Sequence, residues 1–237
     1  MMTNNGSNSY RAAQIFRLEE TCLSSPIAEN IWRTRIEPFE SFTSVAATHW
    51  EMVVTRREGR TYLTVRGPET RATITLIPED AEFFGVQFRL GARLPALPAD
   101  QLVNNALTLP GAGRRSFWLN GSVWEYPTFD NVDVFLSRLM RKGLVVRDPV
   151  VEAALQGQRT DLSLRSVQRR IRHTTGLTHA VIKQIERAQQ AVALLEAGAT
   201  ILDVVERAGY ADQPHLTRAL RRFIGHTPAR IVRERDR

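Results

Sequence analysis

Six polar or basic side chains lie close together near the C-terminus, and their types are those that hydrogen-bond to nucleic acid. They are Gln213, His215, Thr217, Arg218, Arg221 and Arg222. Leu216, Leu220 and Phe223 recur between them at the spacing of one helical face, so the polar side chains point away from the buried face. Amide, imidazole and guanidinium groups match the donors and acceptors of base edges, and arginine also holds phosphates. The segment therefore predicts a helix that contacts duplex nucleic acid in a major groove.

A second segment, LSLRSVQRRIRHTTG at 162–176, repeats this layout. Ser163 can cap a helix in which Val167 and Ile171 face inward at i, i+4 spacing. The side chains left on the outward face are Arg165, Gln168, Arg169 and Arg172. The sequence thus predicts two recognition helices, the first near 163–175 and the second near 213–223.

A long helix is predicted between the two recognition helices. Thr178 is a suitable N-cap and Gly198 a suitable residue just beyond the C-terminal end. Its apolar stripe consists of Val181, Ile185, Ala188, Val192 and Leu195. About 20 residues at ~1.5 Å per residue make a rod of roughly 30 Å. Recognition helices about 34 Å apart can enter successive major grooves on one side of a duplex, so the rod has a suitable length.

The residues around the second recognition helix indicate a helix-turn-helix. Thr200 and Asp203 form a Thr-x-x-Asp signature for a helix N-terminus. Gly209 interrupts that helix, and Asp212 can cap a second one that runs to about Phe223. Two helices joined by a short turn that contains glycine are typical of this motif.

These residues also carry a family resemblance. Residues 162–231 resemble the DNA-binding domain of the AraC/XylS family of bacterial transcription regulators, through LSLRSVQRR…TGL, RAQQAVALLEAG and ILDVVERAGYADQPHLTRALRRFIGHTP. In that family the second motif contains Ala-Gly-Phe/Tyr, a helix N-cap, then His-Leu-x-Arg and a final Gly-x-Thr-Pro, and residues 208–228 follow it almost position by position. The resemblance implies base contacts from Arg165, Gln168 and Arg169 in the first motif, and from Gln213, His215 and Arg218 in the second.

The first motif departs from the family pattern. The family has a scaffold helix and then a positioning helix ahead of the first recognition helix, whereas only DPVVEAALQGQRTD separates Arg147 from Leu162 here. This stretch has room for one helix and a short loop. We therefore expect an abbreviated first motif, in which DPVVEAAL is the single helix ahead of the recognition helix.

Charge and composition agree with a polyanionic partner for the C-terminal part. The 237 residues carry a net charge of +7, of which residues 148–237 supply +5 from 15 basic and 10 acidic side chains. A single cysteine, Cys22, excludes an internal disulfide framework. No apolar run reaches the roughly 18 residues that span a bilayer, and residues 1–10 are predicted to be a disordered tail, not a signal peptide. The expected location is the cytoplasm, without a membrane partner.

The N-terminal half shows the two-residue period of β-strands. Runs at 49–55 and 60–66 flank a short connection that contains glycine, which predicts a hairpin. The inward-facing side chains of two further strands are expected to be Ala72, Ile74, Leu76, Phe84, Val86 and Phe88. The proline-rich residues 94–98 are expected to end the strands, with short helices after them. The clearest of these helices has an apolar face made of Val132, Phe135, Leu136 and Leu139.

The expected fold class is α+β. Residues 1–146 are interpreted as a sensor or dimerisation domain, an antiparallel β half-barrel with helices that is loosely similar to the cupin-like domains attached to such regulators. Residues 147–237 are interpreted as an all-α DNA-binding domain with two helix-turn-helix motifs. The resemblance of the N-terminal half does not identify a ligand.

Residues of the β half could line an effector pocket, although their spacing also suits a hydrophobic core. They are His49, Trp50, Met52, Tyr62, Phe84, Phe88 and Trp124. His49 is the single histidine in the first 150 residues, which argues against the several histidine ligands of a cupin-type metalloenzyme. No serine or cysteine nucleophile pattern accompanies His215. We therefore expect no catalysis, metal or cofactor.

The function that these observations favour is a sequence-specific DNA-binding transcription regulator with an effector-responsive N-terminal domain. The alternative is a DNA-binding protein without an effector, in which the N-terminal domain only dimerises. Expected partners are double-stranded DNA and a second copy of the chain, with a small-molecule effector and RNA polymerase left open. The operator, and activation as opposed to repression, are also left open.

Overall fold

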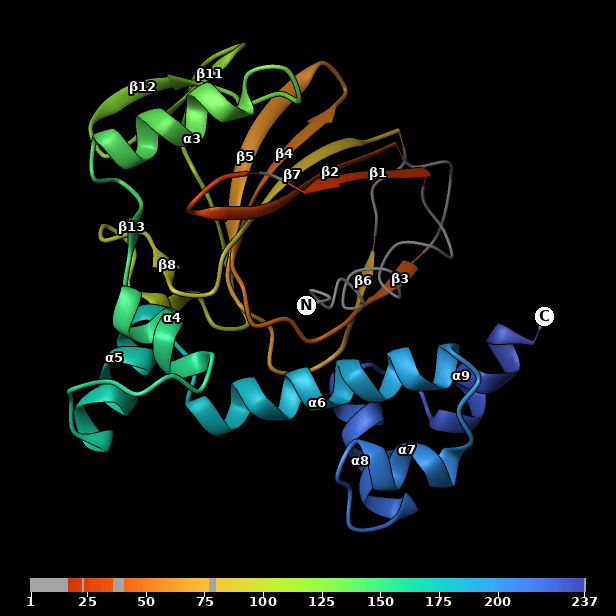
Figure 1. Cartoon of the computed structure of the whole chain (residues 1–237). Helices are drawn as coiled ribbons and strands as arrows, with labels where there is room; N and C mark the ends of the chain where they lie inside the picture. Colours follow the sequence, from red (N-terminus) through yellow and green to blue (C-terminus); the bar gives the residue numbers. More distant parts are fainter. Residues whose placement is uncertain (1–16, 23, 36–40, 77–79, 237) are drawn as a thin grey trace.

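The computed structural model describes residues 17–22, 24–35, 41–76 and 80–236, and it combines antiparallel sheets with a helical C-terminal part (Figure 1). The expected α+β class is thus confirmed, with sheets that are open and not a closed barrel. The strands are β1 (Arg17–Cys22), β2 (Ala28–Arg35), β3 (Ser41–Ser44), β4 (Glu51–Arg57), β5 (Arg60–Arg66), β6 (Thr73–Leu76), β7 (Glu82–Phe88), β8 (Ala92–Arg93), β9 (Ala106–Thr108), β10 (Gly111–Gly113), β11 (Ser116–Leu119), β12 (Ser122–Glu125) and β13 (Val146–Arg147). The predicted tail at 1–10 lies outside the described residues.

The main sheet has the strand order β1-β2-β7-β4-β5-β9, and each pair of neighbouring strands in it is antiparallel. Its central hairpin confirms the prediction, since β4 and β5 pair from Glu51–Arg66 up to Arg57–Arg60. Glu58 and Gly59 form the two-residue turn with φ of 50° and 72°. Positive φ at both turn residues matches the right-handed twist of the flanking strands, which explains why a glycine stands here.

The prediction that helices follow the proline-rich segment is wrong for residues 106–125. These residues form β9 to β12, and β10, β11 and β12 make a separate three-stranded sheet. The turn between β11 and β12 is Asn120-Gly121 with φ of 48° and 71°. Asn-Gly between alternating apolar residues is a strong hairpin signal, because both residues tolerate positive φ. The Asn120-Gly121 pair thus predicts the β11–β12 hairpin from local sequence alone.

The expectation that Ile74 faces inward is also wrong, since 79% of its surface is exposed. The reason is tertiary: among the residues that the structure describes, β6 pairs with β3 alone in a two-stranded sheet, and none of them forms a layer over the face that carries Ile74. Val86 and Phe88 on β7 are buried as expected, and Phe84 packs against the same core. Alternation predicted the strand correctly but could not show which face another layer covers.

The N-terminal core lies between the main sheet, the β11–β12 hairpin and helix α3 (Val132–Arg141). The apolar face predicted for α3 is confirmed, because Val132, Phe135, Leu136 and Leu139 are all buried. Trp124 of β12 meets Phe135 edge to face, with 5.9 Å between ring centroids. Such aromatic pairs add about 0.5–1.5 kcal/mol beyond the area that they bury.

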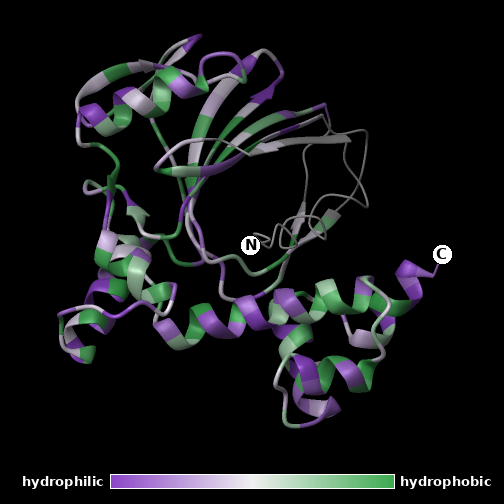
Figure 2. Ribbon diagram, viewed as in Figure 1, coloured by the Kyte–Doolittle hydropathy of each residue, from purple (hydrophilic) through white to green (hydrophobic). Residues whose placement is uncertain are grey.

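The helical part follows the predicted N-caps closely. Its helices are α4 (Pro149–Leu155), α5 (Leu164–Thr175), α6 (His179–Glu196), α7 (Ile201–Arg207), α8 (Gln213–Phe223) and α9 (Pro228–Arg235). Ser163, Thr178, Thr200, Asp212 and Thr227 each accept a backbone N–H at a helix start. Apolar and polar residues alternate along these helices in Figure 2, as amphipathic helices around a common core require.

Two segments of the N-terminal part are hydrogen-bonded to the end of α8. The Ala46 N–H donates to the Phe223 carbonyl and the Ala72 N–H to the Arg222 carbonyl, both at 2.7 Å. Val45 and Ala46 are buried within the apolar cluster of the helices, not within the cluster of the sheet. The two parts of the chain therefore share backbone hydrogen bonds and core.

A second junction lies at α5, beside the short helix α2 (Ala99–Leu102). Gly176, at φ +74°, ends α5 so close to α2 that a Cβ there would lie 2.5 Å from the Ala99 carbonyl oxygen. Only glycine accepts both this φ and this approach without strain. None of the helices described is long and apolar enough to span a membrane.

Candidate nucleic-acid interface

Helix α8 exposes most of the side chains predicted for the second recognition helix. Asp212 caps it by accepting the His215 N–H at 2.6 Å. Leu216, Leu220 and Phe223 are buried, as predicted. Gln213, Arg218, Arg221 and Arg222 are exposed, whereas His215 and Thr217 are half-buried. The helix therefore offers one amide and three guanidinium groups to a partner.

His215 is half-buried and supports the turn before α8. Its Nδ1 accepts the Ala211 N–H at 3.4 Å, and its ring meets the Tyr210 ring edge to face, 5.1 Å between centroids. Burial raises the pKa of the Tyr210 hydroxyl, and the nearby Arg187 guanidinium opposes that shift. The imidazole thus has a structural role in the turn, and its Nε2 remains as the atom for an outside partner.

Arg187 of α6 is a residue that the sequence reasoning missed. Its Nη1 donates to the Gly209 carbonyl at 3.3 Å, and its guanidinium lies 4.8 Å from the centroid of the Tyr210 ring. Together with Gln184, Arg218 and Arg222 it lines a groove of about 180 Å³ between α6 and α8. Nothing in the sequence signalled these contacts of Arg187. The apolar residues of α6 predict its buried face, but they do not show which element packs against its polar face.

Helix α5 has the orientation predicted for the first recognition helix. Val167 and Ile171 are buried, and the Ser163 hydroxyl accepts the Ser166 N–H at 3.3 Å. The four predicted outward side chains, Arg165, Gln168, Arg169 and Arg172, are all exposed. The neighbouring Arg170 instead makes an ion pair with Asp148 at 2.9 Å, which connects α5 to the N-cap of α4.

The abbreviation expected for the first motif is present in the structure. One helix, α4, stands ahead of α5, and residues 156–163 connect the two. Arg169 and Arg172 also line a groove of about 340 Å³ with Arg93 and the segment 94–100. The N-terminal part therefore lies next to the C-terminal half of α5.

Helix α6 separates α5 from α8, the two helices that the sequence predicts to be recognition helices. In Figure 1, α4 and α5 lie at one end of α6, and α7, α8 and α9 lie toward the other. Its 18 residues span about 27 Å at ~1.5 Å per residue. This separation is of the order of one turn of duplex DNA.

Most residues expected in an effector pocket belong to the core of the sheet. Trp50, Met52, Phe88 and Trp124 are buried in the main cluster, Phe84 packs on it, and Tyr62 is half-buried. Trp50 stacks on Phe88 with 3.7 Å between ring centroids, and its Nε1 donates to the Ala92 carbonyl at 2.8 Å.

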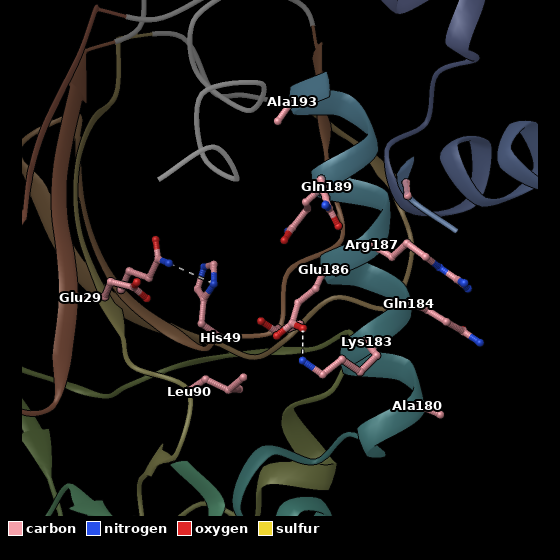
Figure 3. A pocket seen from close by; sticks show the side chains of 14 residues that line it. Glu29, His49, Leu90, Ala180, Lys183, Gln184, Glu186, Arg187, Gln189 and Ala193 are labelled. Atoms are coloured by element: carbon pink, nitrogen blue, oxygen red, sulfur yellow. Dashed lines mark hydrogen bonds and ion pairs between the residues drawn. The ribbon is translucent and has the colours of Figure 1, made fainter. Parts of the chain in front are cut away.

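His49 alone of this set lines a cleft of about 890 Å³ between the sheet and α6. Figure 3 shows His49 and Glu29 on the sheet side of this cleft, opposite Glu186 and Gln189 of α6. The sequence analysis named His49 as a possible pocket residue. Nothing in the sequence indicated that residues of α6 would line the same cleft.

Comparison with known proteins supports the assignment of the helical part. Residues 157–234 match the family model described as a helix-turn-helix domain. The match and the geometry of α7 and α8 identify residues 157–234 as a helix-turn-helix domain. The predicted resemblance to the AraC type is thereby confirmed. The match supports a DNA-binding transcription regulator as the general class of this protein.

A search of solved structures also matched the chain to the structure of ToxT from Vibrio cholerae. The TM-score is 0.39 and the sequence identity 6%, with 92% of this chain and 98% of that chain covered. None of the curated proteins matches the chain.

Proposed function

We propose that this protein is a sequence-specific transcription regulator that binds duplex DNA through α8 and α5 and responds to a small molecule through its N-terminal part. The observation that carries this proposal is the capped α8, which presents Gln213, Arg218, Arg221 and Arg222 from a matched helix-turn-helix domain. Guanidinium and amide groups on the outer face of such a helix are the usual means of base and phosphate contact.

The side chains of α8 are assigned different roles by their position. Gln213 is the first residue of α8 and Arg218 lies at its middle, and in helix-turn-helix proteins the N-terminal residues of the recognition helix contact base edges. Arg222 lies at the C-terminal end, where its carbonyl is held by Ala72, and is assigned to a phosphate. Arg169 and Arg172 of α5 extend the same surface at the other end of α6.

The division of the chain into residues 1–146 and 147–237 is part of the proposal. Support for an effector-responsive N-terminal part comes from the cleft that the sheet and α6 share. Such a cleft places a small molecule in contact with both parts of the chain at once. Dimerisation through the N-terminal part is kept as a separate proposal.

The test is a comparison of single variants of the full chain on selected and on random duplex DNA. Arg218→Ala should weaken binding to the selected site by about 1–3 kcal/mol and leave random DNA almost unchanged. Arg222→Ala should weaken both by a similar factor and reduce the salt slope of log K by about 0.9. Arg60→Ala, at the distant β4–β5 hairpin, is the matched control. Equal losses on both DNAs for Arg218→Ala would contradict its assignment to a base.

A further inference from the structure

The cleft between the sheet and α6 has one wall from each part of the chain. Glu29, His49 and Gln87 come from the sheet side, and Lys183, Glu186 and Gln189 come from α6. Its volume of about 890 Å³ lies within the range of roughly 300–1,000 Å³ that small-molecule sites occupy. Any molecule bound here would contact the sheet and the rod that joins the two recognition helices.

The groups that face the cleft are mostly hydrogen-bond acceptors. Gln87 is only 5% exposed; its Nε2 pairs with His49 Nδ1 at 3.2 Å, and its Oε1 has no hydrogen-bond partner. A buried carbonyl oxygen without a partner is costly, so this atom points to a donor that comes from outside. Gln189 donates its Nε2 to the Ala46 carbonyl at 3.1 Å, which leaves its Oε1 as an acceptor.

The carboxylates of the cleft exceed the cations that can neutralise them. Lys183 Nζ binds Glu186 Oε2 at 2.8 Å, and this pair accounts for one charge of each sign. Arg187 points to the other side of α6, where it holds Gly209 and Tyr210 (Figure 3). Among the residues that the structure describes, no cation forms an ion pair with Glu29. The cleft therefore has one uncompensated negative charge.

From these observations we infer that the cleft binds a small polar molecule that carries a protonated amine or a guanidinium group. Glu29 supplies the counter-charge, and the Oε1 atoms of Gln87 and Gln189 accept hydrogen bonds from the ligand. An apolar ligand would leave these acceptors unpaired and an anionic ligand would be repelled by Glu29, so both classes are disfavoured. The inference rests on the effector-responsive part of the proposed function and names the chemistry of that effector.

The same residues connect the cleft to the second recognition helix. Gln189 binds the Ala46 carbonyl, and the Ala46 N–H binds the Phe223 carbonyl at the end of α8. His49 follows Ala46 by three residues in the same segment. A ligand that holds Gln189 and His49 therefore acts on the segment that anchors α8, and it can change DNA affinity without contacting DNA.

The test is isothermal titration of the full chain with agmatine and spermidine as cationic probes and with succinate and decanoate as anionic ones. We expect saturable one-site binding of at least one cationic probe and none of the anionic probes. Glu29→Gln should weaken that binding about tenfold or more, because a charge-assisted hydrogen bond is lost. Glu29 is exposed, so this variant should fold. Glu125→Gln, on an exposed residue of β12, is the matched control and should bind normally.

The inference is overturned if neither cationic probe binds, if an anionic probe binds instead, or if Glu29→Gln binds as tightly as the original chain. A Gln87→Leu variant checks the second contact and should also weaken the binding. Binding to the selected DNA site is measured on the same preparations. Specific DNA binding without amine binding refutes this inference alone, whereas amine binding without any effect on DNA affinity refutes the effector-responsive part of the proposed function.

Discussion

Single side chains in the helical domain often combine a structural role with exposure to a partner. His215 supports the turn before α8 through Nδ1 and is still partly exposed. His226 is different, because it is buried between α8 and α9 and only 9% exposed. Burial lowers the pKa of His226, nearby Arg230 lowers it further, and Glu234 partly opposes them.

The lowered pKa of His226 predicts that acid destabilises the fold. The unfolded chain takes up the proton near pH 6.5, whereas the folded chain takes it up only at lower pH. The free energy of unfolding should therefore fall as the pH drops below about 6.5 and level off below the folded-state pKa. Urea titrations of the original chain and of His226→Gln at several pH values measure this. The free energy of unfolding of His226→Gln should decline less steeply with falling pH. The control is His173→Gln, at an exposed position of α5, which should behave like the original chain. If the curve of His226→Gln runs parallel to that of the original chain, the prediction is contradicted.

At the scale of elements, the helices depend on their N-caps. In α7, Thr200 and Asp203 cap the helix together. The Thr200 hydroxyl accepts the Asp203 N–H at 3.2 Å. In return, the Asp203 carboxylate accepts hydrogen bonds from the Thr200 hydroxyl and from the Thr200 N–H, and these lower its pKa, the hydroxyl more than the N–H. Asp212 is the N-cap of α8, as Thr200 is of α7, and its side chain accepts the His215 N–H. A cap fixes where the first turn starts, and therefore which side chains face outward.

Removal of the cap of α8 should destabilise the protein by a modest amount. Asp212→Ala is expected to reduce the free energy of unfolding by about 1 kcal/mol, whereas Asp212→Asn should lose much less because asparagine also caps. Urea denaturation of the two variants measures the difference. An equal loss in both would show that the negative charge matters and the hydrogen bond does not. Thr200→Ala gives the same comparison for α7.

At the scale of the whole molecule, the distance between α5 and α8 is set by α6, and both are held by the N-terminal part. Gly176 packs on α2 at one end, and Ala46 and Ala72 bind α8 at the other. Both α5 and α8, the proposed recognition helices, are therefore held against the N-terminal part. A fixed spacing between the two helices implies a fixed spacing between the bases that they contact.

This geometry predicts the layout of the DNA site. Selection of binding sites from random DNA with the full chain should give two conserved blocks about 10 base pairs apart. Arg169→Ala should erase preference in one block, and Arg218→Ala should erase it in the other. A single block that is insensitive to Arg169→Ala would show that α8 alone contacts bases and that α5 contacts phosphates.

The sequence by itself determined the local structure of the helical half. Caps such as Ser163 and Asp212 and the apolar spacing of Val167 and Ile171 depend on residues within one helical turn, so they act in the same way in any fold. The β4–β5 hairpin was predictable for the same reason, and the Asn120-Gly121 turn would have been. The family resemblance supplied the roles of the outward side chains.

Only the tertiary structure decided which surfaces meet. Ile74 alternates like a core residue but has no layer above it among the described residues, and Ala46 comes from the sheet part but lies in the core of the helices. The cleft joins His49 to Gln189, residues 140 positions apart, and no local pattern of either segment indicates the other. The physical reason is that periodicity reports only that a face is buried. The partner of that face is chosen by packing of the whole chain, to which every element contributes.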